Sequence, residues 1–304
     1  MAPMTRFGHS LSLMNSRVND RWRRSTKRLR YRRGSRTAAP PPTVVVGEHV
    51  VDGVFEVRLT NGDRRNVLGR STIDRLEALV ADPPHGTKVI VITSAAPDFC
   101  AGYDLLEASR GDAESLIAHE DNFATLRRSR VPIIAALQGN VIGGGLELAL
   151  SVDVRVATPD TKLAIPAAKL GLVYSEAGIR LVIAAVGDSV ARAMFLAGFV
   201  LDADAAQANG LVVDIVGREQ LRDRAMELAT QMASWSPLAS SGNRKIIDVI
   251  AGRVDDDPRA LRLASFVPHG DLANSIADFV TRRNVTVATQ EANSGKTGNS
   301  LTLD

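Results

Sequence analysis

The amino-acid sequence predicts an α/β fold in which parallel sheet layers are flanked by helices and a helical region follows at the C-terminal end. Apolar runs typical of buried strands, such as Lys88–Thr93 and Ile133–Leu137, alternate with helical segments, and the order strand, strand, helix occurs twice. From about Gly187 the pattern is almost entirely helical. A chain of 304 residues with a hydrophobic fraction of 45% can bury a full core.

The first predicted elements are two strands and a helix. Val44–Val51 and Val54–Thr60 alternate apolar and polar residues as paired strands do. Ser71–Leu79 carries its apolar side chains on one helical face and begins with Ser71 and Asp74 in capping-box spacing. The elements expected next are a strand at Lys88–Thr93, a helix at Asp112–Arg128, a strand at Ile133–Leu137, a glycine turn with a short helix, and strands at Val154–Ala157 and Leu163–Ile165.

The C-terminal third reads as a series of helices. Asp202 is expected to cap a short helix that Gly210 ends, and Leu211–Val216 reads as one brief strand. Helices are then predicted at Leu221–Trp235, Ser240–Ile250, Asp257–Phe266 and Leu272–Arg282. The resulting domain boundaries are a leader at 1–43, a core at 44–215, a helical region at 216–284 and a polar tail at 285–304.

Charge divides the chain into a basic leader and an acidic body. The formal net charge is +3, yet residues 1–36 hold 11 Lys/Arg and one acid, so the remainder carries a net charge of −7. An acidic body argues against nucleic-acid binding by the folded part. The leader is too charged to bury, and Pro40–Pro42 indicates a stiff linker after it.

Three interpretations of residues 1–43 stay open. The segment is a dispensable tail or upstream sequence from a misassigned start, an arginine-rich organellar transit peptide, or an arm that binds nucleic acid or a membrane surface. The first predicts a cytoplasmic protein and the second a mitochondrial one. No apolar run reaches the roughly 18 residues that span a bilayer. The single cysteine and five scattered histidines lead us to expect no disulfide and no metal site.

The most informative stretch is Gly143-Gly144-Gly145, which follows a strand and precedes Glu147. Three glycines permit a close backbone approach to a ligand, and a helix that starts there directs unpaired N–H groups outward. A second glycine-bearing loop, Pro97–Leu105, follows another strand. If the two loops converge, their N–H groups form an oxyanion hole; taken singly, each is also read as an ordinary tight turn.

Glu147 lies among Leu146, Leu148, Ala149 and Leu150. A carboxylate buried there has a raised pKa, which suits proton transfer near neutral pH. The alternative is a helix residue whose side chain reaches solvent.

These segments resemble the crotonase, or enoyl-CoA hydratase/isomerase, family. The resemblance rests first on Asn66–Leu68, Phe99–Leu105 and Gly143–Ala149. Further matches follow in family order at Ile165-Pro166, Leu170-Gly171, Gly198, Gly210–Val212 and Ala277–Arg283. Single motifs are weakly specific, but together they cover about Val44 to Arg283.

The resemblance implies a crotonase-like ββα spiral core with a helical C-terminal region, assembled as a trimer or a dimer of trimers. It implies an acyl-CoA substrate, no separate cofactor, and a thioester carbonyl between the N–H groups of Tyr103 and Gly144. Arg64–Val67 and Cys100–Leu105 would line the CoA channel, and Arg282 and Arg283 match a pair that lies near CoA phosphates in relatives. The substrate-binding residues expected on this basis are Arg65, Val67, Cys100, Gly102, Asp104, Leu105, Gly143, Pro166, Ala167 and Leu170.

The sequence departs from the family's hydratases at one position. They use two glutamates around one water; Glu147 matches the first, but Pro166 is followed by Ala167 where the second would stand. Tyr174 has a spacing similar to family decarboxylases acting on methylmalonyl-CoA, which also lack the second glutamate but carry histidine where this chain has Tyr103. Tyr174 is equally read as a packed aromatic.

Three functions therefore stay open. The first is a hydratase/isomerase-type enzyme that works through a thioester enolate, with Glu147 as its acid/base group. The second is a decarboxylase that uses Tyr174. The third is a non-catalytic acyl-CoA-binding homologue.

Overall fold

The computed structural model describes residues 45–105, 122–266 and 271–281, all within one unit of the chain, residues 42–304. Several predictions lie outside these ranges: the leader at 1–43, most of the helix expected at Asp112–Arg128, the Arg282-Arg283 pair and the polar tail. They remain predictions.

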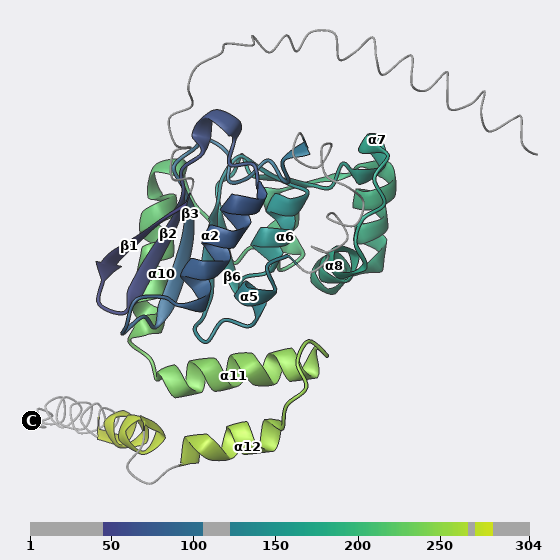
Figure 1. Ribbon diagram of the computed structural model, residues 1–304. Helices are drawn as coiled ribbons and strands as arrows, with labels where there is room; N and C mark the ends of the chain where they lie inside the picture. Colours follow the sequence, from purple (N-terminus) through teal and green to yellow (C-terminus); the bar gives the residue numbers. More distant parts are fainter. Residues whose placement is uncertain (1–44, 106–121, 267–270, 282–304) are drawn as a thin grey trace, which may run out of the picture. The chain divides into compact units, whose positions relative to one another are not determined.

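A six-stranded sheet forms the centre of the described structure (Figure 1). Its strands are β1 (Val45–Val51), β2 (Val54–Leu59), β3 (Val89–Ser94), β4 (Ile133–Leu137), β6 (Val154–Ala157) and β9 (Asp214–Ile215), paired in that order. β1 pairs antiparallel with β2, and every later pairing is parallel. Parallel strands place their carboxyl ends at one edge, so the loops after β3 and β4 leave the sheet side by side.

A second sheet of three short strands carries the turn that leads to Glu147. It contains β5 (Asn140–Ile142), β7 (Lys162–Ala164) and β8 (Val200–Asp202) in the order β5-β7-β8. β5 pairs parallel with β7, and β7 pairs antiparallel with β8. The glycine turn directly follows β5, so this small sheet fixes where α6 (Gly144–Leu150) begins.

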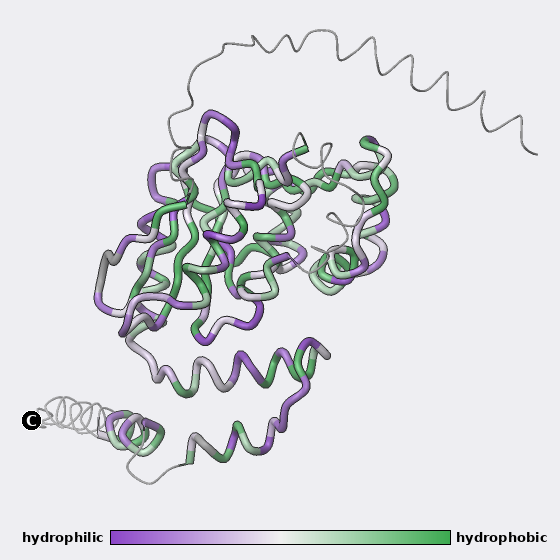
Figure 2. Tube along the Cα trace, in the orientation of Figure 1, coloured by the Kyte–Doolittle hydropathy of each residue, from purple (hydrophilic) through white to green (hydrophobic). Residues whose placement is uncertain are grey.

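The large sheet is buried on both faces, which explains its continuous apolar strands. Ile90 and Ile92 pack into a core with α2 (Arg70–Ala81), α5 (Ala124–Arg127), α6 and α8 (Glu176–Ala197). Val89 and Val91 point to the other face, where they meet α10 (Leu221–Ala233). The hydropathy colouring follows this arrangement, with apolar residues along the strands and polar ones at the loops (Figure 2).

The sequence located several of the helices but not all their ends, and α8 begins at Glu176, before the helical pattern expected from about Gly187. The capping-box prediction is wrong, because α2 begins at Arg70 after Gly69 and has no side-chain cap. The cap at Asp202 is confirmed: its carboxylate accepts from the Ala205 N–H at 2.9 Å, at the start of α9 (Ala203–Ala208). The predicted strand at Leu211–Val216 shortens to β9.

The C-terminal region is helical, as predicted. It contains η3 (Arg218–Gln220), α10, α11 (Pro237–Ile250), α12 (Pro258–Leu263), η4 (Ala264–Phe266) and a further helix at 271–281. Two short helices, the 3₁₀ helix η2 (Gly62–Arg64) and α7 (Ala167–Leu170), lie earlier in the chain. α11 starts three residues earlier than expected, because Ser236 caps it and Pro237 occupies its first turn.

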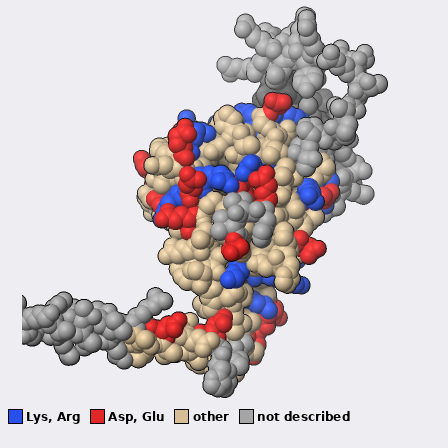
Figure 3. Space-filling model, turned by 90° about the vertical axis from the view of Figure 1, so that its left-hand side faces the viewer, with Lys and Arg blue, Asp and Glu red and all other residues tan. Residues whose placement is uncertain are grey.

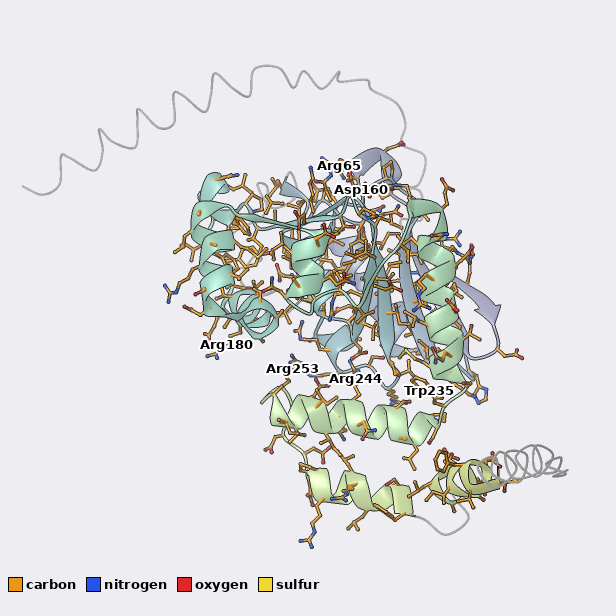
Figure 4. All side chains as sticks on the ribbon, turned by 180° about the vertical axis from the view of Figure 1, so that it is seen from behind. Arg65, Asp160, Arg180, Trp235, Arg244 and Arg253 are labelled. Atoms are coloured by element: carbon orange, nitrogen blue, oxygen red, sulfur yellow. The ribbon has the colours of Figure 1, made fainter. Side chains whose placement is uncertain are left out.

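Arg244 joins α11 to the sheet-bearing part of the chain (Figure 4). Its guanidinium pairs with Asp153 at 2.7 Å and donates to the Ser129 carbonyl at 2.6 Å. Within the described ranges, no helix is long and apolar enough to cross a membrane.

Candidate active site

Glu147 is buried, with 6% of its surface exposed, in the first turn of α6. The interpretation of Glu147 as a solvent-reaching helix residue is therefore wrong. A carboxylate inside a low-dielectric core is costly unless hydrogen bonds satisfy it. Its surroundings supply those bonds.

Two tyrosine hydroxyls donate to Glu147, one to each carboxylate oxygen. The Tyr103 hydroxyl lies 3.1 Å from Oε2, and the Tyr174 hydroxyl donates to Oε1. The Tyr174 ring also packs edge-on against Phe195 of α8, with ring centroids 5.2 Å apart. Three separate segments therefore meet at one carboxylate.

Burial dominates the ionisation of this cluster. It raises the pKa of Glu147 above its ordinary value, and the hydrogen bonds from Tyr174 and Tyr103 and the charge of Arg127 offset this only in part. Burial and the neighbouring carboxylate also raise the pKa of both tyrosines, so the phenols stay protonated and act as hydrogen-bond donors. Glu147 is thus the group of this cluster that is suited to exchange a proton.

Close packing explains why three glycines precede the glutamate. Gly143 has φ 53° and ψ −118°, a backbone conformation that L side chains rarely adopt. A Cβ on Gly144 would lie 2.7 Å from the Tyr103 ring, and one on Gly145 would lie 2.5 Å from the Cys100 carbonyl oxygen. The glycines let α6 begin directly against the loop after β3.

That loop runs between two backbone partners. Cys100 pairs with Val141 of β5 on one side, and Tyr103 forms a parallel bridge with Leu68 on the other. The Leu68 bridge uses the Gly102 carbonyl and the Asp104 N–H, so the N–H of Tyr103 points away from Leu68. A Cβ on Gly102 would lie 3.5 Å from the Gly144 nitrogen, so the loop and the start of α6 adjoin.

The N–H groups of Tyr103 and Gly144 have no backbone partner among the described residues. Gly144 is the first residue of α6, where helical hydrogen bonding leaves the N–H unused. Two such donors in adjoining segments can together stabilise a developing oxyanion.

Asn66 fastens the preceding segment to the same loop. Both Arg65 and Asn66 have positive φ, at 54° and 53°. The Asn66 amide nitrogen donates to the Phe99 carbonyl at 3.0 Å, and the Arg65 guanidinium pairs with Asp98 at 2.6 Å. These bonds hold the loop in shape before it reaches Tyr103.

Cys100 belongs to this loop and is fully buried, and its thiol donates to the Asn66 carbonyl at 3.0 Å. Burial raises the pKa of the Cys100 thiol to about 12. This environment argues against Cys100 as a catalytic thiol, because the thiolate is the reactive form.

The remaining predicted residues lie around the cluster at different depths. Val67, Gly143 and Pro166 are partly buried, and Gly102 and Ala167 are buried. Leu105 and Leu170 are 56% and 46% exposed. Asp104 pairs with Arg64 at 2.7 Å, which ties η2 to the loop. Gly143 donates its N–H to the Ala164 carbonyl, so the strand leading to Pro166 lies beside the glycine turn.

The sequence did not single out Asn122 and Arg127. The Asn122 amide donates to the Tyr103 hydroxyl at 3.1 Å. Arg127 donates to Ser151 at 2.9 Å, and Ser151 donates to the Glu147 carbonyl at 2.8 Å. No local signal marks these residues, because their role depends on the packing of α5 against α6.

A separate cavity of about 280 Å³ lies on the α10 face of the large sheet, away from Glu147. It contains three arginines, each paired with a carboxylate. Arg58 and Arg222 share the fully buried Glu56 at 3.1 and 2.6 Å, and Arg218 pairs with Asp160. Acidic and basic side chains are likewise intermixed on the face drawn in Figure 3. The described residues contain no group of side chains that could hold a metal ion.

Comparison with known families decides the relationship. The model of the Enoyl-CoA hydratase/isomerase family matches residues 50–284. The chain belongs to this family. The predicted crotonase membership and fold class are thereby confirmed.

Individual relatives agree with this assignment. A probable enoyl-CoA hydratase (echA6) of Mycobacterium leprae (strain TN) is 33% identical over 213 residues, which are 67% of this chain and 83% of that protein. The 2,3-dehydroadipyl-CoA hydratase of Escherichia coli (strain K12) is 36% identical over 176 residues, covering 57% and 68%. A solved enoyl-CoA hydratase subunit of Geobacillus kaustophilus HTA426 superposes with a TM-score of 0.72 at 25% identity, over 79% of this chain and 95% of that one.

Proposed function

We propose that this protein binds an acyl-CoA thioester and catalyses proton transfer at the carbon next to the thioester carbonyl. The carbonyl oxygen accepts hydrogen bonds from the backbone N–H groups of Tyr103 and Gly144, and Glu147 carries the proton. The observation that supports this most is a buried carboxylate with raised pKa in a cluster that also contains two backbone N–H groups with no backbone partner in the described part of the chain. The substrate class, an acyl-CoA thioester, is inferred from membership of the family.

In this mechanism, the two N–H groups stabilise negative charge as it develops on the thioester oxygen. Glu147 removes the proton from the adjacent carbon and leaves an enolate. Because Ala167 stands where hydratases of the family carry their second glutamate, Glu147 also returns the proton. In the hydration of an enoyl thioester, it takes a proton from the water whose oxygen bonds to the β-carbon and delivers that proton to the α-carbon as the enolate collapses. One acid/base group contributes roughly 10²–10⁴-fold to such a reaction.

The CoA part is proposed to lie along Arg64–Val67 and the Cys100–Leu105 loop. Leu105 and Arg65 are exposed there, so they are available to a ligand. Pro166, Ala167 and Leu170 are proposed to border the acyl group, since the strand before them lies beside Gly143.

A decarboxylase that acts on a methylmalonyl-type thioester is the second candidate. It is favoured by the position of Tyr174, whose hydroxyl reaches the reaction centre at Glu147. In the described arrangement that hydroxyl is already donated to Glu147, so orienting a substrate carboxylate requires it to change partner. Two carboxylates side by side also repel one another. Proton transfer by Glu147 is therefore the preferred proposal.

One set of assays distinguishes the candidates. The chain is incubated with crotonyl-CoA and methylmalonyl-CoA, in parallel with the variants Glu147→Gln, Tyr174→Phe and Ala167→Glu. Crotonyl-CoA hydration that is lost in Glu147→Gln and increased in Ala167→Glu supports the proposal. Methylmalonyl-CoA turnover that survives Glu147→Gln and fails in Tyr174→Phe supports the decarboxylase. Saturable binding without turnover of any thioester supports a non-catalytic homologue, and no binding of any CoA ester overturns the assignment.

We also propose that the chain self-associates, as its family resemblance implies. Large apolar side chains are exposed around α7, the end of α8 and β8: Leu170, Leu172, Val173, Leu196, Phe199 and Val200. Contiguous apolar surface of this kind is typical of an interface. Light scattering after size-exclusion chromatography is expected to give three or six times the chain mass. A monomer would contradict this proposal.

A further inference from the structure

A hydrogen-bonded chain leads from Asn122 to the carboxylate of Glu147. The Asn122 amide nitrogen donates to the Tyr103 oxygen at 3.1 Å, and Tyr103 donates to Glu147 Oε2 at 3.1 Å. An amide nitrogen is only a donor, so the Tyr103 oxygen must accept from it. The phenol proton is thereby directed toward Glu147.

A second set of hydrogen bonds links the backbone of Asn122 to the backbone carbonyl of Glu147. Its backbone carbonyl accepts from Arg127 Nη1 at 3.3 Å, and the same nitrogen donates to Ser151 at 2.9 Å. Ser151 donates to the backbone carbonyl of Glu147 at 2.8 Å. One path therefore reaches the carboxylate through Tyr103, and another reaches the backbone of the same residue through Arg127 and Ser151. Linked donors of this kind fix one another's orientation.

We propose that Asn122 is a positioning residue for Glu147: it fixes the direction of the Tyr103 hydroxyl and so keeps a hydrogen-bond donor on Glu147 Oε2. This inference rests on the proposed role of Glu147 as the proton carrier. Asn122 acts through Tyr103, which separates it from the carboxylate, and Arg127 holds Asn122 in place.

In the described part of the chain, few other groups act on the ionisation of the Glu147 carboxyl. Tyr174 donates to its other oxygen, and the charge of Arg127 acts on it from α5. α8 packs against α6, and its charged residues pair with one another at the surface: Glu176 with Arg180 at 2.6 Å and Asp188 with Arg192 at 2.6 Å. Removal of the Asn122 donor is therefore expected to register directly in the ionisation of Glu147.

The test is a ¹³C NMR titration of the Glu147 carboxyl in the full chain without substrate, with the signal assigned from its loss in Glu147→Gln. In Asn122→Asp, an aspartate oxygen replaces the amide nitrogen, accepts the Tyr103 proton and adds a negative charge. The titration midpoint of Glu147 is expected to rise by about one pH unit. Asn122→Ala removes the donor without adding charge, and a smaller rise is expected. Asn209→Asp is the matched control, because Asn209 is exposed at the end of α9.

An unchanged midpoint in both Asn122 variants overturns the proposal, as does an equal rise in Asn209→Asp. If Asn122→Asp does not fold, as judged by circular dichroism, Asn122→Ala decides alone. The titration needs no turnover, so its result is independent of whether a CoA ester is the substrate. With an active thioester, Asn122→Ala is further expected to lower kcat about tenfold, the equivalent of one hydrogen bond, with KM unchanged.

Discussion

Gly144→Ala is the substitution that most sharply tests the geometry of the site. A Cβ at this position would lie 2.7–2.8 Å from three atoms of the Tyr103 ring. Carbon atoms in ordinary contact are about 3.5–4.0 Å apart, so the ring must move by roughly 1 Å. That movement breaks the 3.1 Å hydrogen bond to Glu147 and shifts the Tyr103 N–H. A misplacement of about 1 Å costs on the order of 10²-fold in rate.

The assay is the exchange of the α-protons of butyryl-CoA with D₂O, followed by ¹H NMR. This reaction requires only formation of the enolate, so it does not depend on the natural acyl group. Gly144→Ala is expected to exchange about 10²-fold more slowly than the wild type. Its free energy of unfolding should fall by about 1–3 kcal/mol, because the added methyl group crowds a packed site.

Gly242→Ala is the matched control. Gly242 lies in α11, and a Cβ there meets no atom within 4 Å. This variant should exchange at the wild-type rate. Exchange at the wild-type rate in Gly144→Ala, or the same loss in Gly242→Ala, would refute the reasoning.

Two further predictions concern groups outside the reaction centre. Cys100 should resist iodoacetamide at pH 8 in the folded chain and react after unfolding, because its pKa is about 12 and its side chain is buried; rapid labelling of the native chain, read by mass spectrometry, would contradict this. Glu56→Gln should lower the free energy of unfolding at pH 7 by about 1–3 kcal/mol, a loss limited because Arg58 and Arg222 reach solvent. Burial alone raises the pKa of Glu56, but bonds from Arg222 and Thr93 and the charges of Arg58 and Arg222 lower it below its ordinary value. The Glu56 carboxylate therefore stabilises the fold at pH values above the pKa that it has in the unfolded chain, and this stability is lost as the pH falls through its pKa in the folded chain. Urea titrations of the wild type and of Glu56→Gln should therefore give similar free energies of unfolding in acid and different ones at neutral pH.

Much of the fold follows from local patterns. The apolar runs at β3 and β4 and the amphipathic pattern of α2 have the periodicity that burial requires, so the sequence located them. β5 was read as part of the glycine turn, because a strand of three residues is too short to show a period. The helix ends were less predictable, since Gly69 rather than Ser71 precedes α2 as its cap.

Some residues of the candidate site could be predicted from the sequence, and others could not. The glycines and Glu147 are contiguous, so their role could be inferred from one stretch of sequence. The side chain of Tyr103 lies 44 residues from Glu147 and that of Tyr174 lies 27 away, and their meeting depends on three segments converging. The sequence predicted Tyr103 as an oxyanion-hole residue through its backbone N–H. It left two interpretations of Tyr174, a residue that orients a substrate carboxylate and a packed aromatic. The contact of both phenols with Glu147, and that of Asn122 behind Tyr103, is visible only in three dimensions.

The central claim is that Glu147 exchanges a proton with the carbon next to an acyl-CoA carbonyl. The most direct measurement is α-proton exchange of butyryl-CoA in D₂O by the wild type and by Glu147→Gln. The wild type should exchange, and Glu147→Gln should lose at least 10²-fold in rate while binding the thioester with similar affinity. Exchange that is equally fast in Glu147→Gln, or absent from a wild type that binds the thioester, would contradict the account.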